Sequence, residues 1–230
     1  MTDVVVLPDA EAAAVRLADQ LASRLADTRR DDGVFHLALA GGDTPRRAYE
    51  LLGEMEIAWD HAHVWLVDER CVPRDDPQSN ARMIDRSLFA HAGAGPPRLH
   101  PVDGEALPED AAWLYARELD VHVPDGVLDM VVLGVGEDGH IGSLFAHHPL
   151  LEAHHVPCAA IHDSPKPPAR RVTLTLPWLR AARHTVLLAD GAAKRDALHR
   201  ALGQPDPATP ASLLGDGLNE VICDAAADPR

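Results

Sequence analysis

Short apolar runs alternate with amphipathic segments along the whole chain, and this alternation restricts the fold more than any other feature. Strands are expected at 4–7, 35–40, 63–67, 129–135, 156–162, 171–176, 184–189 and 220–223. Helices are expected over 9–29, from Pro45, after a Ser79 cap, over 108–119 and from about Ala192. Strands that alternate with helices predict an α/β fold, with a mainly parallel sheet and helices on both faces.

The chain has 230 residues, which is enough for one large domain or two small ones. Apolar residues make up 46% and aromatic residues 4%, so the core should consist mostly of Ala, Val, Leu and Ile. The Pro- and Gly-rich segments at 93–97 and 204–210 are interpreted as surface loops rather than linkers. We therefore expect a single domain over 1–230.

The formal net charge is −15, which argues against nucleic acid or an anionic membrane as a partner. A small anionic substrate would need a local cluster of basic side chains within this acidic chain. Most basic residues are arginines, and the only lysines are Lys166 and Lys194.

The cysteines Cys71, Cys158 and Cys223 are far apart and form no CxxC pair, which favours a reduced protein over a disulfide framework. The N-terminal segment lacks the basic and apolar regions of a signal peptide, and no stretch approaches the length of a membrane span. We expect a cytoplasmic protein with no membrane partner. As a working expectation we take it to be a monomer or weak homodimer.

Three predicted strand ends are chemically dense, and ligands of parallel sheets lie outside the carboxyl ends of the strands. The first strand end carries Gly41, Gly42, Asp43 and Thr44. Glycine lets the backbone approach a ligand closely, and the start of the following helix suits an anion such as phosphate. Thr44 is a candidate hydroxyl donor. The alternative is a plain strand–turn–helix connection that binds nothing.

The second strand end carries Asp68, Glu69 and Arg70 at the edge where ligands bind. The alternative is a solvated acidic pair with Arg70 as its partner. Further positive charge comes from the adjacent pair at 170–171 and from Lys194 near a helix start. A forked guanidinium is well suited to phosphate, although paired surface arginines are usually only solvated.

The third strand end contains Gly134, Gly136 and Gly139 in the spacing G-x-G-x-x-G. This fingerprint indicates a dinucleotide site only if a helix follows, and the segment 140–151 contains glycine, a histidine pair and proline, which disfavour a helix. A catalytic loop fits better. His140 is a candidate general base and Asp138 a candidate for orienting it.

Histidines are frequent after this loop but loosely spaced, so we interpret them as loop residues and expect no metal site. They are His147, His148, His154, His155 and His162.

Five segments read together resemble one family. GGDTP, VDERCVP, GVGEDGHIGSLF, SPKPPARRVTLTLP and GAAK occur in this order and span nearly the whole chain. The set resembles the bacterial 6-phosphogluconolactonases, which are related to glucosamine-6-phosphate deaminases and share a Rossmann-like three-layer α/β sandwich. The resemblance implies hydrolysis of 6-phospho-D-glucono-1,5-lactone to 6-phospho-D-gluconate in the oxidative pentose phosphate pathway, without a cofactor.

The resemblance also implies roles for individual residues. His140 would activate water, with Asp138 beside it, and Asp68 and Arg70 would act at the second strand end. Of the arginine pair, Arg171 rather than Arg170 matches the family position, and Lys194 matches the family's late lysine. The chain departs from the family pattern at Asp43, where serine is usual, and at Ile141, Gly142 and Ala146.

Three other functions remain open. A glucosamine-6-phosphate deaminase would have a catalytic Glu five residues after the histidine, where this chain has Phe145. A non-catalytic sugar-phosphate sensor would bind the ester without hydrolysing it. A dinucleotide-dependent dehydrogenase would bind NAD(P)H.

Overall fold

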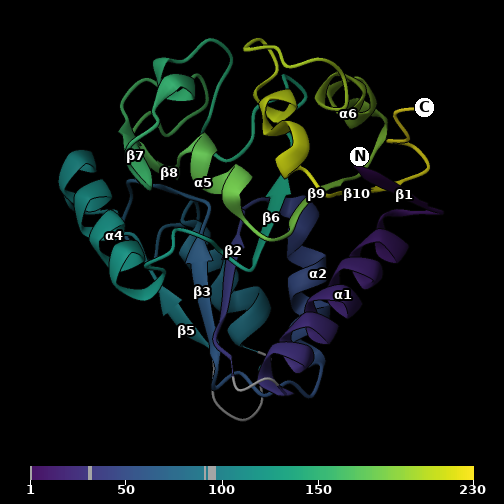
Figure 1. Ribbon diagram of the computed structural model, residues 1–230, viewed down its shortest axis with the longest axis horizontal. Helices are drawn as coiled ribbons and strands as arrows, with labels where there is room; N and C mark the ends of the chain where they lie inside the picture. Colours follow the sequence, from purple (N-terminus) through teal and green to yellow (C-terminus); the bar gives the residue numbers. More distant parts are fainter. Residues whose placement is uncertain (1, 31–32, 91, 93–96) are drawn as a thin grey trace.

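The computed structural model describes residues 2–30, 33–90, 92 and 97–230, and its main sheet has seven strands whose neighbours all run parallel. The strand order is β1-β10-β9-β6-β2-β3-β5. The strands are β1 (Asp3–Leu7), β2 (Phe35–Leu39), β3 (Ala62–Leu66), β5 (Arg98–His100), β6 (Met130–Gly134), β9 (Thr185–Ala189) and β10 (Glu220–Asp224). The predicted mainly parallel α/β sheet is confirmed (Figure 1).

Helices cover both faces of this sheet, and the apolar strand β9 is accordingly buried at every residue. The helices are α1 (Ala10–Arg30), α2 (Asp43–Glu54), α3 (Asn80–Ile84), α4 (Pro108–His122), α5 (Leu176–Ala181) and α6 (Arg195–Ala201). α1 and α2 pack against each other, and α4 lies on the opposite flank (Figure 1). A π-helical turn at Asp85–Phe89 and 3-10 turns at Pro149–Glu152, Ala192–Lys194 and Pro210–Gly217 complete the described helical segments.

Local sequence signals account for most helix starts. Ser79 caps α3 by accepting a hydrogen bond from the Arg82 amide, and Pro108 is the first residue of α4, both as expected. α2 begins at Asp43, two residues before the predicted Pro45. Gly42, with a φ of 110°, turns the chain directly after β2, and proline is tolerated within the first helical turn because no intrahelical partner is lost there.

A second, antiparallel sheet was not predicted. Its order is β4 (Asp68–Arg70), β8 (Arg171–Leu174), β7 (Cys158–Ile161). Val67 forms the corner between the sheets, because its amide bonds to Leu39 on the main sheet and its carbonyl accepts from Leu174 on β8. The residues predicted as a charged strand end are therefore a short strand themselves.

Two further elements were missed, β5 and α5. The predicted loop at 93–97 falls mostly outside the described residues, whereas residues 204–207 of the other predicted loop are exposed. The order of the main sheet reverses between β2 and β6, since β2 leads to β3 on one side and β6 to β9 on the other. Such a switch point is where an open α/β sheet binds its ligand.

Candidate active site

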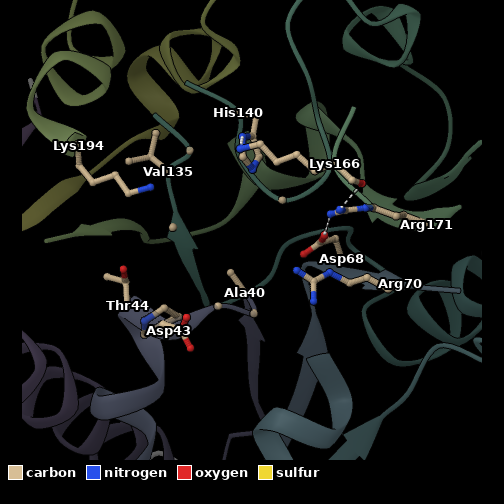
Figure 2. A pocket seen from close by; sticks show the side chains of 16 residues that line it. Ala40, Asp43, Thr44, Asp68, Arg70, Val135, His140, Lys166, Arg171 and Lys194 are labelled. Carbon is tan, nitrogen blue, oxygen red and sulfur yellow. Dashed lines mark hydrogen bonds and ion pairs between the residues drawn. The ribbon is translucent and has the colours of Figure 1, made fainter. Parts of the chain in front are cut away.

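A pocket of about 300 Å³ opens at this switch point, and it collects most of the predicted site residues (Figure 2). Its walls come from the ends of β2, β6 and β9, from β4 and β8, and from the loops that follow them. The lining residues are Ala40, Gly41, Gly42, Asp43, Thr44, Pro45, Asp68, Arg70, Gly134, Val135, Gly136, His140, Gly142, Lys166, Arg171 and Lys194. Asp138 does not line the pocket but contacts His140 from behind.

The end of β2 and the start of α2 form one wall of the pocket. Gly41 is required there, because a Cβ would lie 1.9 Å from the Asn80 side-chain oxygen. No side chain caps α2, so its first amides face the pocket wall without a side-chain partner. The Asp43 carboxylate is 92% exposed and pairs with Arg46. The Thr44 hydroxyl donates to Asp190, so its proton is not directed to a ligand as the sequence suggested.

Two arginines face each other across the second sheet. Arg70 on β4 is paired in register with Arg171 on β8, and like charges in directly opposite positions destabilise a sheet. The nearest compensating carboxylate is that of Asp68, 3.8 Å from Arg171 Nη1. Arg70 Nε is buried and has no hydrogen-bond partner among the described residues. The repulsion between the two arginines would be offset by an anionic group bound beside them.

The Arg171 side chain is only 5% exposed. Its Nε donates to the Pro168 carbonyl, its Nη2 to the Lys166 carbonyl at 2.8 Å, and its Nη1 to the Ser143 hydroxyl. Burial lowers the pKa of Arg171, while the nearby Asp68 charge opposes that shift. Arg171 therefore ties the loop before β8 to the pocket wall and has few donors left over.

Buried polar groups fix Asp68 in place. Its carboxylate accepts a 2.6 Å hydrogen bond from the Ser143 hydroxyl and a longer one, of 3.3 Å, from the side-chain amide of Asn80. Asn80 is positioned in turn by Glu69, a buried carboxylate that accepts hydrogen bonds from the backbone amides of Asn80 and Ala81. Burial raises the pKa of Glu69 although these hydrogen bonds oppose the shift. The sequence predicted Asp68 but not the supporting role of Glu69.

His140 lies on the loop after β6, which turns through Gly139 with a φ of 85°. His140 Nδ1 lies 2.5 Å from Asp138 Oδ1. Burial lowers the pKa of His140, as does the Lys166 charge, whereas Asp138 and Asp68 act in the opposite direction. Burial would raise the pKa of Asp138, but the His140 hydrogen bond and the Lys166 charge outweigh it and the pKa is lowered.

The contact with Asp138 sets the tautomer of His140. An ionised carboxylate only accepts hydrogen bonds, so the imidazole proton lies on Nδ1 and the lone pair on Nε2. Neutral His140 can therefore act as a base toward a group in the pocket.

The loop around His140 explains the departures at Ile141 and Gly142. Ile141 is fully buried in the core. Gly142 has a φ of 51°, and a Cβ there would lie 2.9 Å from Val67. The rings of Phe145 and His140 pack with their centroids 5.0 Å apart. The Arg171 guanidinium lies over the Phe145 ring, 5.7 Å from its centroid. No helix begins within the described segment 135–148, so the glycine fingerprint lacks the helix that a dinucleotide site requires.

The two lysines lie at different places in the pocket. Lys194 stands on the side of Thr44 and Asp43, whereas Lys166 lies beside His140 on the way to Arg171 (Figure 2). Arg171 and Lys194 are thus separated by the pocket and do not surround a single group. Sequence reasoning did not assign Lys166 to the site, although its rarity in an arginine-rich chain was a usable signal.

The described residues contain no group of three or more His, Cys, Asp or Glu side chains arranged to hold a metal ion. Within the same ranges, no helix is both long and apolar enough to cross a membrane.

An all-parallel sheet with a cationic pocket at its switch point defines a Rossmann-like α/β protein with a small-molecule site. A family model described as glucosamine-6-phosphate isomerases/6-phosphogluconolactonase matches residues 8–223, and the chain belongs to this family. The resemblance seen in the sequence is thereby confirmed.

Individual relatives agree with this assignment. A 6-phosphogluconolactonase from Mycobacterium tuberculosis is 33% identical, over 90% of this chain and 88% of that protein. The human GDH/6PGL endoplasmic bifunctional protein is 35% identical over 79% of this chain, which spans only 24% of that longer protein. The structure of a 6-phosphogluconolactonase from Thermotoga maritima matches with a TM-score of 0.85 and 28% identity, covering 97% of this chain and all of that one.

Proposed function

We propose that this protein hydrolyses 6-phospho-D-glucono-1,5-lactone to 6-phospho-D-gluconate, as a step of the oxidative pentose phosphate pathway. Family membership and the relatives that carry the name 6-phosphogluconolactonase support the reaction class. One structural observation supports it most strongly. The neutral His140, backed by Asp138, opens on a pocket lined by Arg70, Lys166, Arg171 and Lys194 in a chain of net charge −15.

The pocket has two cationic ends, and the substrate carries a phosphate at one end and a lactone carbonyl at the other. The start of α2, with Lys194 on the same side, offers free amides and an ammonium group for the phosphate. Arg70, Arg171 and Asp68 lie at the other end, and Phe145 contacts both Arg171 and His140. We therefore assign the phosphate to the first end and the lactone carbonyl to the second. Fixing the phosphate would hold the ring in the geometry needed for attack.

The reaction follows from these positions. His140 Nε2 takes a proton from water as the water oxygen bonds to the carbonyl carbon. The carbonyl oxygen becomes negative and is stabilised by the positive charges of Arg70 and Arg171, which line the pocket. The bond from the carbonyl carbon to the ring oxygen then breaks. The His140 imidazolium returns its proton to the departing ring oxygen, and the new carboxyl group ionises. Asp138 stabilises the imidazolium throughout.

Two alternatives fit the pocket less well. The deaminase interpretation needs a carboxylate where the chain has Phe145, whose ring contacts both His140 and Arg171. A sensor would bind the ester but would have no use for a base with an open nitrogen. The intact His140–Asp138 pair therefore favours the hydrolase.

The setting of the protein is part of the same proposal. Its cysteines are free, and Cys158 and Cys223 are buried, which suits a reducing cytoplasm. We further propose a single domain over 1–230 that acts as a monomer or weak homodimer without a cofactor.

The proposal is tested by adding the protein to freshly generated 6-phosphogluconolactone and subtracting the spontaneous rate of hydrolysis. Acid release should rise in proportion to protein concentration. Glucosamine 6-phosphate, assayed in parallel for ammonia release, should give no reaction. Ammonia from that substrate without lactone hydrolysis would replace the hydrolase with the deaminase.

A further inference from the structure

Lys166 lies closer to the proposed base than any other cation of the pocket that the structure describes. Its Nζ is 3.4 Å from His140 Nδ1 and 3.6 Å from Asp138 Oδ2. Figure 2 shows its side chain running toward the His140 ring. No role for this lysine follows from the sequence or from the proposed reaction as stated above.

The backbone around Lys166 is held in place from two sides. The Ser164 hydroxyl donates to the Lys166 carbonyl at 2.7 Å and accepts a bond from the Lys166 amide. Arg171 Nη2 donates to the same carbonyl from β8. The Lys166 side chain itself is 47% exposed, so a fixed backbone presents a half-exposed ammonium group at His140.

The charges around His140 act on its pKa in opposite directions. The carboxylates of Asp138 and Asp68 both favour the protonated imidazolium. A general base that is protonated at neutral pH cannot accept a proton from water. Burial and the Lys166 charge act against the two carboxylates. Among the charged groups that act on the ring, Lys166 is thus the one that opposes the rise in pKa caused by Asp138 and Asp68.

We propose that Lys166 is a positioning residue that keeps His140 neutral, and that Arg171 holds Lys166 there through the loop backbone. The inference rests on the proposed function, because it concerns the base of that reaction. The positive charge of the ammonium group repels the imidazolium, whereas the Asp138 carboxylate, which only accepts hydrogen bonds, keeps the proton of the neutral ring on Nδ1. The same repulsion makes the imidazolium a stronger acid when it returns its proton to the ring oxygen.

The direct test is an NMR titration of the His140 ring in the wild type and in the Lys166→Met and Lys166→Arg variants, with the His140→Ala spectrum used for assignment. Even a water-like dielectric predicts that loss of a unit charge about 4 Å away raises the titration midpoint by at least about half a pH unit. Lys166→Met should show this rise. Lys166→Arg, which keeps the charge, should titrate close to the wild type.

A kinetic measurement extends the test. The acid limb of kcat/KM against pH should move up by the same amount in Lys166→Met. Lys194→Met removes the other lysine of the pocket and should lower kcat/KM without moving the acid limb. An unchanged His140 midpoint in Lys166→Met, or an equal shift in Lys194→Met, would overturn the inference.

The two failures are distinguishable. The NMR titration needs no substrate, so a shifted midpoint in a protein that does not hydrolyse the lactone contradicts the proposed function alone. Lactone hydrolysis together with an unshifted midpoint contradicts the role of Lys166 alone.

Discussion

His140 and a separate set of four histidines share the chemistry that often marks a catalytic site. This second set, the histidine cluster, is formed by His36 on β2, His63 on β3, His100 on β5 and His122 at the end of α4. Burial lowers the pKa of His140, His36, His63 and His100 alike. Each group also holds a carboxylate on an Nδ1 atom, Asp138 for His140 and Glu118 for His100.

The difference lies in what the remaining nitrogens contact. In the histidine cluster the described contacts of these nitrogens are with other rings. His100 Nε2 lies 3.1 Å from His63 Nδ1, and the Trp65 indole donates to His36 Nδ1. The His100 ring stacks on Trp65 with centroids 3.8 Å apart. His140 instead lines a pocket. A lowered pKa and a carboxylate partner therefore do not identify a base, whereas an open nitrogen in a cationic cavity does.

The largest expected effect separates the two groups by activity. His140→Ala should lower kcat for 6-phosphogluconolactone by about two to four decades, the usual contribution of a general base, while the protein stays folded. His100→Gln, in the histidine cluster, should leave kcat within about threefold. Steady-state kinetics and thermal melts of both variants check this, and wild-type turnover in a folded His140→Ala protein would remove His140 from the mechanism.

The next effect concerns the neighbours Arg170 and Arg171. Arg171→Ala should lower kcat/KM by at least about tenfold, because one charge-assisted contact is worth about 1.5–3 kcal/mol. It should do so for the phosphorylated and the unphosphorylated lactone alike, since Arg171 lies at the end of the pocket opposite Lys194, where we place the lactone carbonyl. Arg170 is exposed, and Arg170→Ala should change little. A larger loss at Arg170 would shift the assignment by one residue.

A smaller effect appears in stability rather than activity. The pKa of His63 is lowered to about 4 by burial, with His100, His36, His122 and Arg98 adding to the shift. Asp129, Asp125 and Glu118 oppose the corresponding shifts of the cluster neighbours His36 and His100. The unfolded chain therefore binds more protons between about pH 6.5 and pH 4.

Stability from the histidine cluster should accordingly be complete above about pH 6.5 and be lost as the pH falls toward 4. Thermal melts should show Tm falling by at least about 4 °C from pH 7 to pH 5. His63→Gln, which cannot titrate, should reduce this fall. An identical pH dependence in the variant would show that other groups cause it.

The smallest expected effect is that of metal removal. In the histidine cluster, His100 Nε2 and His63 Nδ1 hydrogen-bond to each other and His36 Nδ1 accepts from Trp65, and the described residues offer no ligand set for a metal. Exhaustive EDTA treatment should therefore leave lactonase activity unchanged. Loss of activity that zinc alone restores would contradict this expectation.

The sequence predicted the parallel sheet and the residues at its carboxyl edge. Gly41, His140 and Lys194 follow strands of the main sheet, and in a parallel sheet such positions converge whatever the strand order. Their convergence in one pocket needs only local patterns and that rule.

The contacts that the sequence did not predict depend on non-local pairing. Asp68 meets Ser143 only because β4 leaves the main sheet and pairs with β8. Lys166 reaches His140 only because Arg171 holds its loop from β8. No periodicity in the segment 164–171 encodes that approach, so it could be found only in the folded structure.

The central claim is that one end of the pocket holds a phosphate while His140 acts on the lactone at the other. The most direct test compares kcat/KM of the wild type for 6-phosphogluconolactone and for gluconolactone without the phosphate. Two charge-assisted contacts, from Lys194 and from the start of α2, predict a preference of at least about 100-fold for the phosphorylated lactone. Lys194→Met should lose part of that preference. Equal kcat/KM values for the two lactones would contradict the account.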